Sequence, residues 1–306
     1  MKTINHATIV GGGYIGIELL ESMVKNNIKT TLVEAAPHIM SMLDEDIAKL
    51  ITDYIESESG DLVKIITDDK VISFNGHEKV EEVLTSNGER FETDMVILCT
   101  GVKPTVDIAA DAGIKIGVTG AIKVNSRMET NIDNIYACGD CIEETNIITS
   151  RQTWLPLGTN ANKEGRCAAV NLAGYTEDFE GVLGSAVTRY ISLTISATGL
   201  THKEALEFGY DPVSIIVTKR DKAGYMPEVQ NVTIKLTADK RTHKILGGQA
   251  IGCGDADKRI NTLAIGLFNG ITVEEFVGAD MTYAPPFSTT IDPLLSAARM
   301  LIDKLK

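Results

Sequence analysis

The chain has 306 residues, of which 43% are hydrophobic and 23% charged, a composition typical of a folded globular protein and not of a disordered one. Its length suffices for two or three domains. A formal net charge of -13 would repel the phosphates of a nucleic acid, so we expect no nucleic-acid partner.

The sequence also argues against a membrane or secreted protein. No apolar run approaches the roughly 20 residues of a membrane span, and the amino terminus lacks the apolar core of a signal peptide. The five cysteines are an odd number spread over a long chain, which favours a reducing, cytoplasmic location. The five histidines have no metal-ligand spacing, so we expect no metal site.

The first predicted element is a buried strand over residues 7–10, followed at once by a glycine motif and an apolar helix stripe. Residues 11–16 (GGGYIG) fit G-x-G-x-x-G. In that motif Gly11 permits a tight turn, Gly13 lets a pyrophosphate approach the backbone, and Gly16 lets the helix pack on the strand. Free N–H groups at the helix start bind phosphate oxygens. We therefore predict a dinucleotide site; the alternative is a glycine-rich turn without a ligand.

An acidic residue ends the second predicted strand, which covers residues 29–34. Glu34 lies 18 residues after Gly16 and can accept hydrogen bonds from a ribose diol. Its charge would repel a 2′-phosphate, so we predict NAD(H) and not NADP(H). FAD can use the same glycine motif, and the motif alone does not choose between the two nucleotides.

The elements that follow complete an α/β unit. Apolar spacing predicts a helix over 44–57, and Asn-Gly pairs predict hairpins between three short antiparallel strands. A continuous apolar run at 95–98 is suited to a central parallel strand. Gly101 follows that strand, where an open α/β sheet places a cofactor contact, although an ordinary turn explains it equally well. The three hairpin strands are expected near 70–74, 80–85 and 90–92.

Four segments in order, GGGYIGIE, LVEAAP, CTGVKP and TNIDNIYACGD, resemble those of the flavin-dependent pyridine nucleotide-disulfide oxidoreductases. The branch of NADH oxidases, NADH peroxidases and coenzyme A-disulfide reductases is the most similar. The resemblance covers essentially the whole chain and implies an α/β fold. Its parts would be a Rossmann-like NAD(H)-binding domain at 1–103, half of a split FAD-binding domain at 104–180, and an α+β dimerisation domain at 181–306. It implies a homodimer.

The resemblance also assigns residues to the two cofactors. It implies that Ile15 and Glu18 lie near the nicotinamide. Tyr14, inside the glycine motif, is a further expected cofactor contact. Asp140 would hydrogen-bond the ribityl chain of FAD, with a surface turn as the alternative. Residues 157–166 resemble a helix that passes the flavin ring. There the expected contacts are Ala161, Asn162 and Lys163, with ordinary helix surface as the alternative.

The last part of the sequence has alternating strand-like runs and capped helices. Thr201-x-x-Glu204 and Thr272-x-x-Glu275 are capping boxes. Strands are predicted at 188–195, 212–218, 231–236 and 245–251, and helices at 257–269 and 293–305.

Two tyrosines in this part are candidates for the catalytic centre. Tyr283, in YAPPF, matches a family segment that reaches the flavin site of the partner subunit. Tyr225 falls where coenzyme A-disulfide reductases have a second tyrosine. A phenol can donate a hydrogen bond to a thiolate or a peroxide, and otherwise each tyrosine is an amphipathic core residue.

The sequence departs from the family in one large respect. Members begin with a flavin-binding GxGxxG followed by a redox cysteine, whereas the motif at residue 11 matches their second, NADH-binding one. We therefore expect the first half of the FAD domain and the redox cysteine to be missing, and apolar surface to be uncovered over 104–180. The explanations are a truncated chain, which we favour, a separate polypeptide with the missing half, or a protein that has lost flavin.

Two smaller features concern the cysteines and the substrate. Cys138 and Cys141 have C-x-x-C spacing, but Cys138 is expected to be buried in the apolar strand IYAC, so we interpret both as structural. Ile291 stands where coenzyme A-disulfide reductases have a lysine, which weakens a coenzyme A substrate. The predicted function is hydride transfer from NADH through FAD to a disulfide, peroxide or oxygen acceptor. The alternative is a non-catalytic NADH-binding and dimerisation module.

Overall fold

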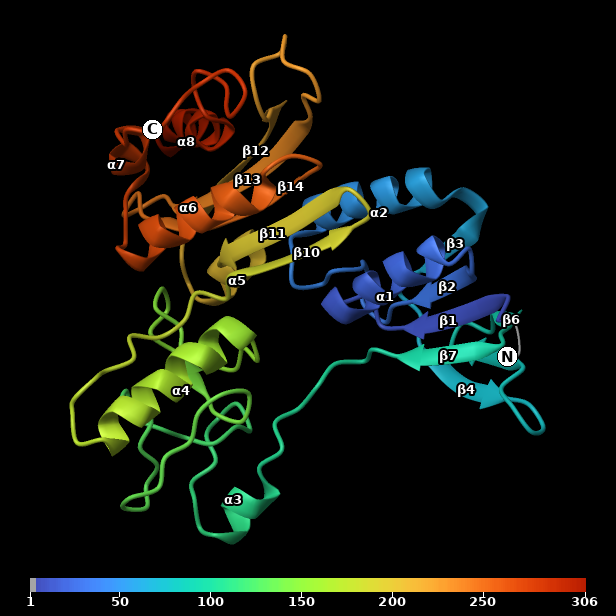
Figure 1. Ribbon diagram of the computed structural model, residues 1–306. Helices are drawn as coiled ribbons and strands as arrows, with labels where there is room; N and C mark the ends of the chain where they lie inside the picture. Colours follow the sequence, from blue (N-terminus) through green and yellow to red (C-terminus); the bar gives the residue numbers. More distant parts are fainter. Residues whose placement is uncertain (1–3) are drawn as a thin grey trace.

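The computed structural model describes residues 4–306 and begins with a parallel sheet covered by helices (Figure 1). The strand order is β3-β2-β1-β7. Apolar side chains of α1 and α2 cover this sheet because their buried residues recur at helical spacing. The elements are β1 (His6–Val10), α1 (Tyr14–Lys25), β2 (Lys29–Val33), α2 (Glu45–Ser59), η1 (Gly60–Leu62), β3 (Val63–Ile66) and β7 (Met95–Leu98).

Two features of this sheet differ from the sequence prediction. The strand β3 was not predicted, since its two buried residues, Val63 and Ile66, are three positions apart and do not show the alternation of a half-buried strand. The strand β7 pairs only with β1 and lies at the edge of the sheet, not at its centre. Leu98 at its end is 63% exposed, because no further described strand covers that edge.

A three-stranded antiparallel sheet follows, as the Asn-Gly pairs predict. It consists of β4 (Val71–Asn75), β5 (Glu82–Thr85) and β6 (Arg90–Glu92) in sequence order. The Asn87-Gly88 pair lies in the short β5–β6 turn, where the Gly88 N–H donates to the Thr85 carbonyl at 3.1 Å.

The middle of the chain has little regular structure and a small core of its own. Figure 1 shows an extended segment that leads away from β7 to this part. Large apolar side chains are exposed here, among them Ile108 (90%) and Val118 (89%), as predicted for 104–180. The elements are α3 (Asp107–Asp111), β8 (Glu144–Thr145), β9 (Gln152–Thr153) and α4 (Gly158–Leu172).

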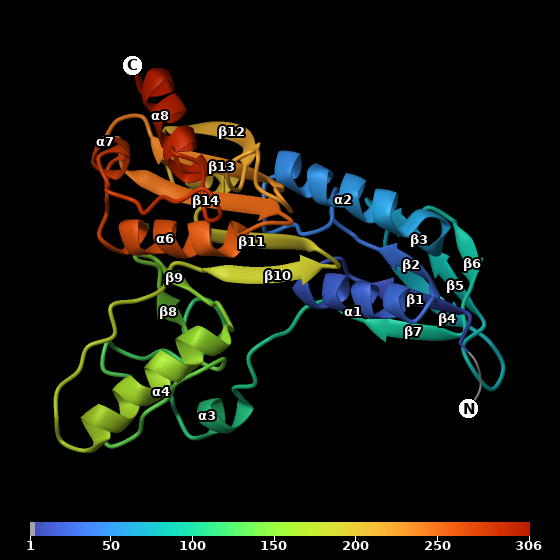
Figure 2. The ribbon, with the colours of Figure 1, turned by 45° about the horizontal axis from the view of Figure 1, so that its top comes forward.

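The last part is a five-stranded antiparallel sheet of order β10-β11-β14-β13-β12. The helices α6 and α8 pack on it, and Figure 2 shows α6 lying along β11 and β14. The elements are β10 (Ala186–Tyr190), β11 (Leu193–Gly199), α5 (His202–Glu207), β12 (Pro212–Arg220), β13 (Asn231–Asp239), β14 (Ile245–Gly252), α6 (Ala256–Phe268), α7 (Val273–Val277) and α8 (Pro293–Leu305).

One prediction in this part is wrong and several are confirmed. The run 188–195 is not one strand but two, β10 and β11, joined by a tight turn in which Ile191 has a φ of 54°. An isoleucine is unusual in that conformation, so the sequence does not signal the turn. Both capping boxes form at α5 and α7, and α8 has the predicted bounds.

The first and last parts of the chain share a hydrophobic core. Tyr190, Leu193, Ile195 and Ile251 from the antiparallel sheet belong to the same buried cluster as the apolar residues of α1, α2 and the parallel sheet. Figure 2 shows the β10–β11 hairpin beside α1. The two parts therefore pack as one body, while the middle of the chain extends from it. No helix among residues 4–306 is long and apolar enough to cross a membrane.

Candidate functional site

The glycine turn between β1 and α1 has the geometry that the motif requires. Gly11 has a φ of +106°, and a Cβ there would lie 2.3 Å from the Cys99 carbonyl oxygen. A Cβ on Gly16 would lie 2.0 Å from the Gly11 carbonyl oxygen, so α1 packs directly against the turn. At Gly13 a Cβ would meet only Met42 Cε, at 3.7 Å. The first and last glycines are thus required by packing, while Gly13 leaves space in front of the helix.

The amino end of α1 provides donors for an anion. Its first helical bond runs from the Ile17 N–H to the Gly13 carbonyl at 3.0 Å, and the Gly13 N-cap has no side-chain bond. The N–H groups of Tyr14 and Ile15 therefore precede the helical ladder and can point at a ligand. No acidic residue lies in the first turn to compete for them. This donor set fits a pyrophosphate.

Glu34 lies against the glycine turn. Its Oε2 accepts a hydrogen bond from the Gly12 N–H at 2.6 Å, and its Oε1 accepts one from the Ala36 N–H at 2.8 Å. Two backbone donors therefore fix the carboxylate at the end of β2. Gly12 was missed by the sequence analysis: a Cβ there would lie 2.8 Å from Ile39 Cγ2, so this glycine is also needed for packing.

Ile15 and Glu18 lie on the exposed side of α1, and Glu18 contacts the antiparallel sheet. Ile15 is 56% exposed, and Glu18 Oε1 accepts a hydrogen bond from Thr188 Oγ1 at 2.9 Å. Between α1 and the β10–β11 hairpin lies an open groove of about 480 Å³. Its lining residues are Glu18, Glu21, Val187, Thr188, Arg189, Thr194 and Asp257. Glu18 therefore lies where the first and last parts of the chain meet.

Tyr14 and Gly101, two further candidate cofactor-binding residues, lie near the glycine turn. Burial raises the pKa of Tyr14 to about 12, so its hydroxyl stays protonated at neutral pH. Gly101 has a φ of +97° and open surroundings two residues after Cys99, whose carbonyl faces Gly11. The chain thus brings Gly101 to the same end of the sheet as the glycine turn.

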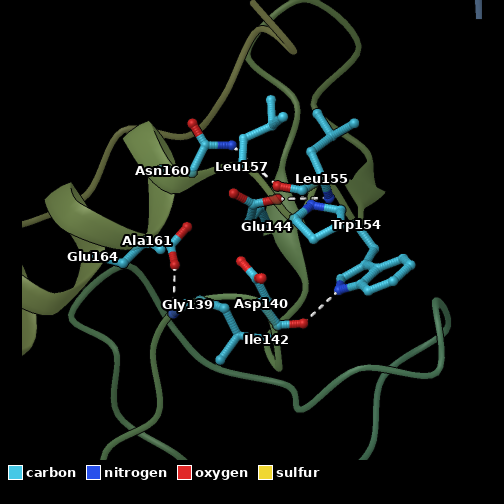
Figure 3. A pocket seen from close by; sticks show the side chains of 11 residues that line it. Gly139, Asp140, Ile142, Glu144, Trp154, Leu155, Leu157, Asn160, Ala161 and Glu164 are labelled. Atoms are coloured by element: carbon cyan, nitrogen blue, oxygen red, sulfur yellow. Dashed lines mark hydrogen bonds between the residues drawn. The ribbon is translucent and has the colours of Figure 1, made fainter. Parts of the chain in front are cut away.

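A second, smaller depression lies in the middle of the chain around Asp140 (Figure 3). Gly139 has a φ of +80°, and the Asp140 carbonyl accepts a hydrogen bond from Trp154 Nε1 at 2.8 Å. The depression has no space large enough to hold a water molecule, so it falls far short of the roughly 300–1,000 Å³ of a complete ligand pocket. These residues can form one wall of a cofactor site. The lining residues are Gly139, Asp140, Ile142, Glu144, Trp154, Leu155, Pro156, Leu157, Asn160, Ala161 and Glu164.

The contribution of α4 to this wall differs from the expectation. Ala161 lines the depression, but its N–H already donates to the Leu157 carbonyl at 3.0 Å, so it is not a free donor at the helix start. Asn162 and Lys163 are exposed and lie outside the lining, where Asn160 takes part instead. The helix begins at Gly158, so a contact expected at its start falls one turn too late in the chain.

The segments that carry the two candidate tyrosines meet, and neither tyrosine lines either depression. Tyr225, between β12 and β13, is 77% exposed, and Tyr283, between α7 and α8, is 47% exposed. Their segments meet through a hydrogen bond from the Ala223 N–H to the Pro285 carbonyl at 3.1 Å. Neither tyrosine is the buried core residue that the alternative interpretation required.

The cysteines are all free, and one differs from the prediction. Cys138 is exposed and lies outside any strand, two residues after Tyr136, which forms an isolated β-bridge with Glu129. The Cys141 thiol donates to the Cys138 carbonyl at 3.4 Å. Burial raises the pKa of both thiols, which keeps them protonated and poorly nucleophilic at neutral pH.

Comparisons with known proteins agree with this arrangement. Residues 1–165 match the family described as pyridine nucleotide-disulphide oxidoreductase, and residues 185–294 match its dimerisation domain. The chain belongs to the pyridine nucleotide-disulphide oxidoreductase family, and the predicted α/β fold with a C-terminal dimerisation domain is confirmed.

Individual relatives cover nearly all of the chain. An NAD(P)H sulfur oxidoreductase (CoA-dependent) of Pyrococcus furiosus is 37% identical over 298 residues, which are 97% of this chain and 66% of the relative. The structure of an NAD-dependent persulfide reductase from A. fulgidus has a TM-score of 0.95 at 32% identity, covering 98% of this chain and 55% of that one. The structure of a water-forming NADH oxidase from Lactobacillus brevis, bound to NADH, has a TM-score of 0.93 at 28% identity. The match covers 99% of this chain and 67% of that one. The chain therefore spans slightly less than two thirds of the length of its first curated relative.

Proposed function

We propose that the complete protein is a flavoprotein oxidoreductase that passes a hydride from NADH through FAD to a disulfide, peroxide or oxygen acceptor. The observation that carries the proposal is the glycine turn at the start of α1, with free helix N–H groups and Glu34 fixed beside it. Similar proteins support this class of reaction, since they include an NAD(P)H sulfur oxidoreductase, a persulfide reductase and an NADH oxidase.

The residues of this chain would bind and orient the cofactors. The N–H groups at the start of α1 would bind the pyrophosphate of NADH, and Glu34 would accept hydrogen bonds from its adenosine ribose. Asp140 and Ala161 would form one wall of the FAD site, with the Asp140 carboxylate toward sugar-like hydroxyls. When bound, FAD supplies a ring that accepts the hydride and passes electrons on. Glu18 and Gly101, at the open end of the sheet, would border the nicotinamide.

The last part of the chain would form the interface between two subunits. We propose a homodimer through residues 181–306, which the match to a dimerisation domain supports. Tyr225 and Tyr283 would then act on the acceptor from their shared exposed position. The division at 1–103, 104–180 and 181–306 and the cytoplasmic location are part of the same proposal.

A second function, an NADH-binding and dimerisation module without redox activity, is favoured by one observation. The depression at Asp140 is only one wall of a site, and apolar side chains of the middle part, such as Ile108, are uncovered among the described residues. A visible spectrum of the purified protein separates the two functions. Flavin bands that NADH bleaches without oxygen support the oxidoreductase, whereas a colourless protein that binds NADH supports the module.

The choice of nucleotide gives the sharpest test of the glycine turn. We expect Glu34→Ala to weaken NADH binding about tenfold or more, because it removes a charged acceptor worth roughly 1.5–3 kcal/mol. Glu34→Gln keeps an acceptor for the Gly12 N–H and should weaken NADH less while improving NADPH. Isothermal titration with both nucleotides measures these changes, with Glu56→Ala on the exposed face of α2 as the control. Equal affinity of the parent protein for NADH and NADPH would contradict the role of Glu34.

A further inference from the structure

Two buried carboxyl groups lie behind the Asp140 depression, and neither has an assigned role. Glu144, at the start of β8, is 5% exposed, and Glu164, in α4, is 1% exposed. The Leu155 N–H donates to Glu144 Oε2 at 2.9 Å, and the Gly139 N–H donates to Glu164 Oε2 at 2.7 Å. Figure 3 shows both bonds and the two carboxyl groups on the inner wall.

The other oxygen of each carboxyl group needs a hydrogen-bond partner. Glu144 Oε1 and Glu164 Oε1 are buried and accept no hydrogen bond from a donor among the described residues. Both side chains line the same small depression, and Figure 3 shows their carboxyl groups next to each other. Two ionised carboxylates in contact repel each other, whereas one shared proton turns the contact into a hydrogen bond and satisfies both oxygens.

No cation neutralises the pair in its place. Within residues 4–306, no lysine, arginine or histidine forms an ion pair with Glu144 or Glu164. A pair of buried charges of the same sign without a counter-ion is strongly unfavourable. Protonation of one member is therefore the physical solution that remains.

We propose that Glu144 and Glu164 share one proton, and that this hydrogen bond holds the Gly139–Asp140 turn against α4. Glu164 binds the turn through the Gly139 N–H, and Glu144 binds the 154–157 segment through the Leu155 N–H, so the pair ties together three segments of the wall. The two glutamates are positioning residues. Their relevance to flavin rests on the proposed function, but the shared proton does not.

Loss of this proton should loosen the turn near pH 8. Burial, with Glu164 adding to it, raises the pKa of Glu144 to about 8, while the Leu155 N–H and the Asn160 amide oppose the rise. Other titratable groups near the pair are the Asp140 carboxyl group, which lines the same depression, and the thiols of Cys138, Cys141 and Cys167. Burial raises the pKa of all three thiols above the ordinary value of a cysteine, so they titrate at a higher pH than the pair.

The chain contains its own reporter of the turn. Trp154 is the only tryptophan, and its indole N–H donates to the Asp140 carbonyl. Tryptophan fluorescence of the protein without added cofactor should therefore change between about pH 6.5 and 9.5 with a midpoint near 8. The infrared band of a protonated carboxyl group should disappear over the same interval, because ordinary aspartates and glutamates are already ionised there.

Amide variants separate the proton from the shape of the side chains. In Glu144→Gln the amide N–H donates permanently to Glu164, so we expect the fluorescence change and the infrared band to vanish while the fluorescence at pH 7 stays that of the parent. The matched control is Glu143→Gln. Glu143 is also buried, but it accepts from Thr119 Oγ1 at 3.2 Å and should leave both titrations unchanged. The proposal is overturned if the parent lacks the carboxyl band, or if Glu144→Gln retains the fluorescence titration.

Binding of FAD to the same proteins links the pair to the flavin wall. We expect the FAD dissociation constant of the parent to rise several-fold from pH 7 to pH 9, and that of Glu144→Gln to stay level. If the band and fluorescence titrate but FAD does not bind at either pH, the shared proton stands and the flavin function fails. If FAD binds equally at both pH values while the pair titrates, the positioning of the flavin wall by this pair is overturned.

Discussion

The glycines between β1 and α1 are needed for different physical reasons. Gly11 combines a left-handed φ with close approach of the Cys99 carbonyl, while Gly12 packs on Ile39 and Gly16 packs on the turn itself. Gly13 alone leaves free space. The motif therefore fixes the backbone at three positions and leaves one open for a ligand.

Two helix glycines offer a matched test of this packing. We expect Gly16→Ala to abolish NADH binding and to destabilise the protein, because the new Cβ would lie 2.0 Å from a backbone oxygen. Gly165→Ala in α4 meets no atom within 4 Å and should instead stabilise by about 0.5–1 kcal/mol through its better helix propensity. Thermal unfolding and NADH titration of both variants measure the difference. A stable Gly16→Ala protein that binds NADH normally would contradict the close packing at the turn.

At this scale the sequence predicts residues that belong to a local motif and misses those that depend on long-range contacts. Gly11, Gly16 and Glu34 lie where the strand–turn–helix pattern places them. Glu144 and Glu164 are 20 positions apart in the sequence and have no spacing that indicates contact. Only the fold brings their carboxyl groups together.

Among the elements, those with local signals at their ends were predicted best. The capping boxes at α5 and α7 form because the threonine and glutamate needed for each lie within one turn. The β10–β11 turn was missed because Ile191 is apolar and β-branched, so it gives no turn signal. The position of β7 at the sheet edge depends on partners that its own apolar residues cannot specify.

The start of α8 combines a helix cap with a buried ion pair. Asp292 Oδ1 accepts from the Leu294 N–H at 2.8 Å, and Asp292 Oδ2 lies 3.1 Å from Arg259 Nη2. The Arg259 side chain is only 7% exposed. Asp292 therefore joins α8 to α6.

Two variants at Asp292 separate these contributions. Asp292→Asn keeps a good cap but removes the charge that faces Arg259, so we expect a loss of about 2–3 kcal/mol in the free energy of unfolding. Asp292→Ala should lose about 1 kcal/mol more because the cap is also gone. Urea unfolding of both variants measures these values. Identical stabilities of the two would mean that the cap contributes nothing.

On the scale of the whole molecule, a buried polar network joins the first and last parts of the chain. Lys235 Nζ, in β13, lies 3.0 Å from Asp44 Oδ2 and 2.7 Å from Asp46 Oδ2, at the start of α2. Gln249, in β14, donates to Asp44 at 2.6 Å. Although burial opposes ionisation, the Lys235 ammonium and the His202 N–H hold the pKa of Asp44 below its ordinary value.

Removal of the lysine should destabilise this junction. We expect Lys235→Met to reduce the free energy of unfolding by about 3–5 kcal/mol at pH 7, because a buried carboxylate loses its counter-ion. Lys49→Met is the control, since its pair with Asp53 at 3.1 Å is exposed and is worth less than about 1 kcal/mol.

The effect of Lys235→Met should depend on pH. The lowered pKa of Asp44 means that its contribution in the parent is present above the ordinary pKa of an aspartate and is lost as the pH falls through the folded-state pKa. Without Lys235, burial favours the neutral acid, so the difference between parent and variant should shrink below about pH 4. Urea unfolding at pH 7 and at about pH 3, below the ordinary pKa of an aspartate, measures it. A deficit that is independent of pH would contradict an electrostatic role.

The core shared by the two ends of the chain has a consequence for protein synthesis. The apolar face of α1 and α2 is completed by Tyr190, Leu193, Ile195 and Ile251, which leave the ribosome after the whole middle part. Because synthesis adds about 5–20 residues per second, that face stays uncovered for on the order of ten seconds. The nascent parallel sheet can therefore bind chaperones until the β10–β11 hairpin and β14 have been synthesised.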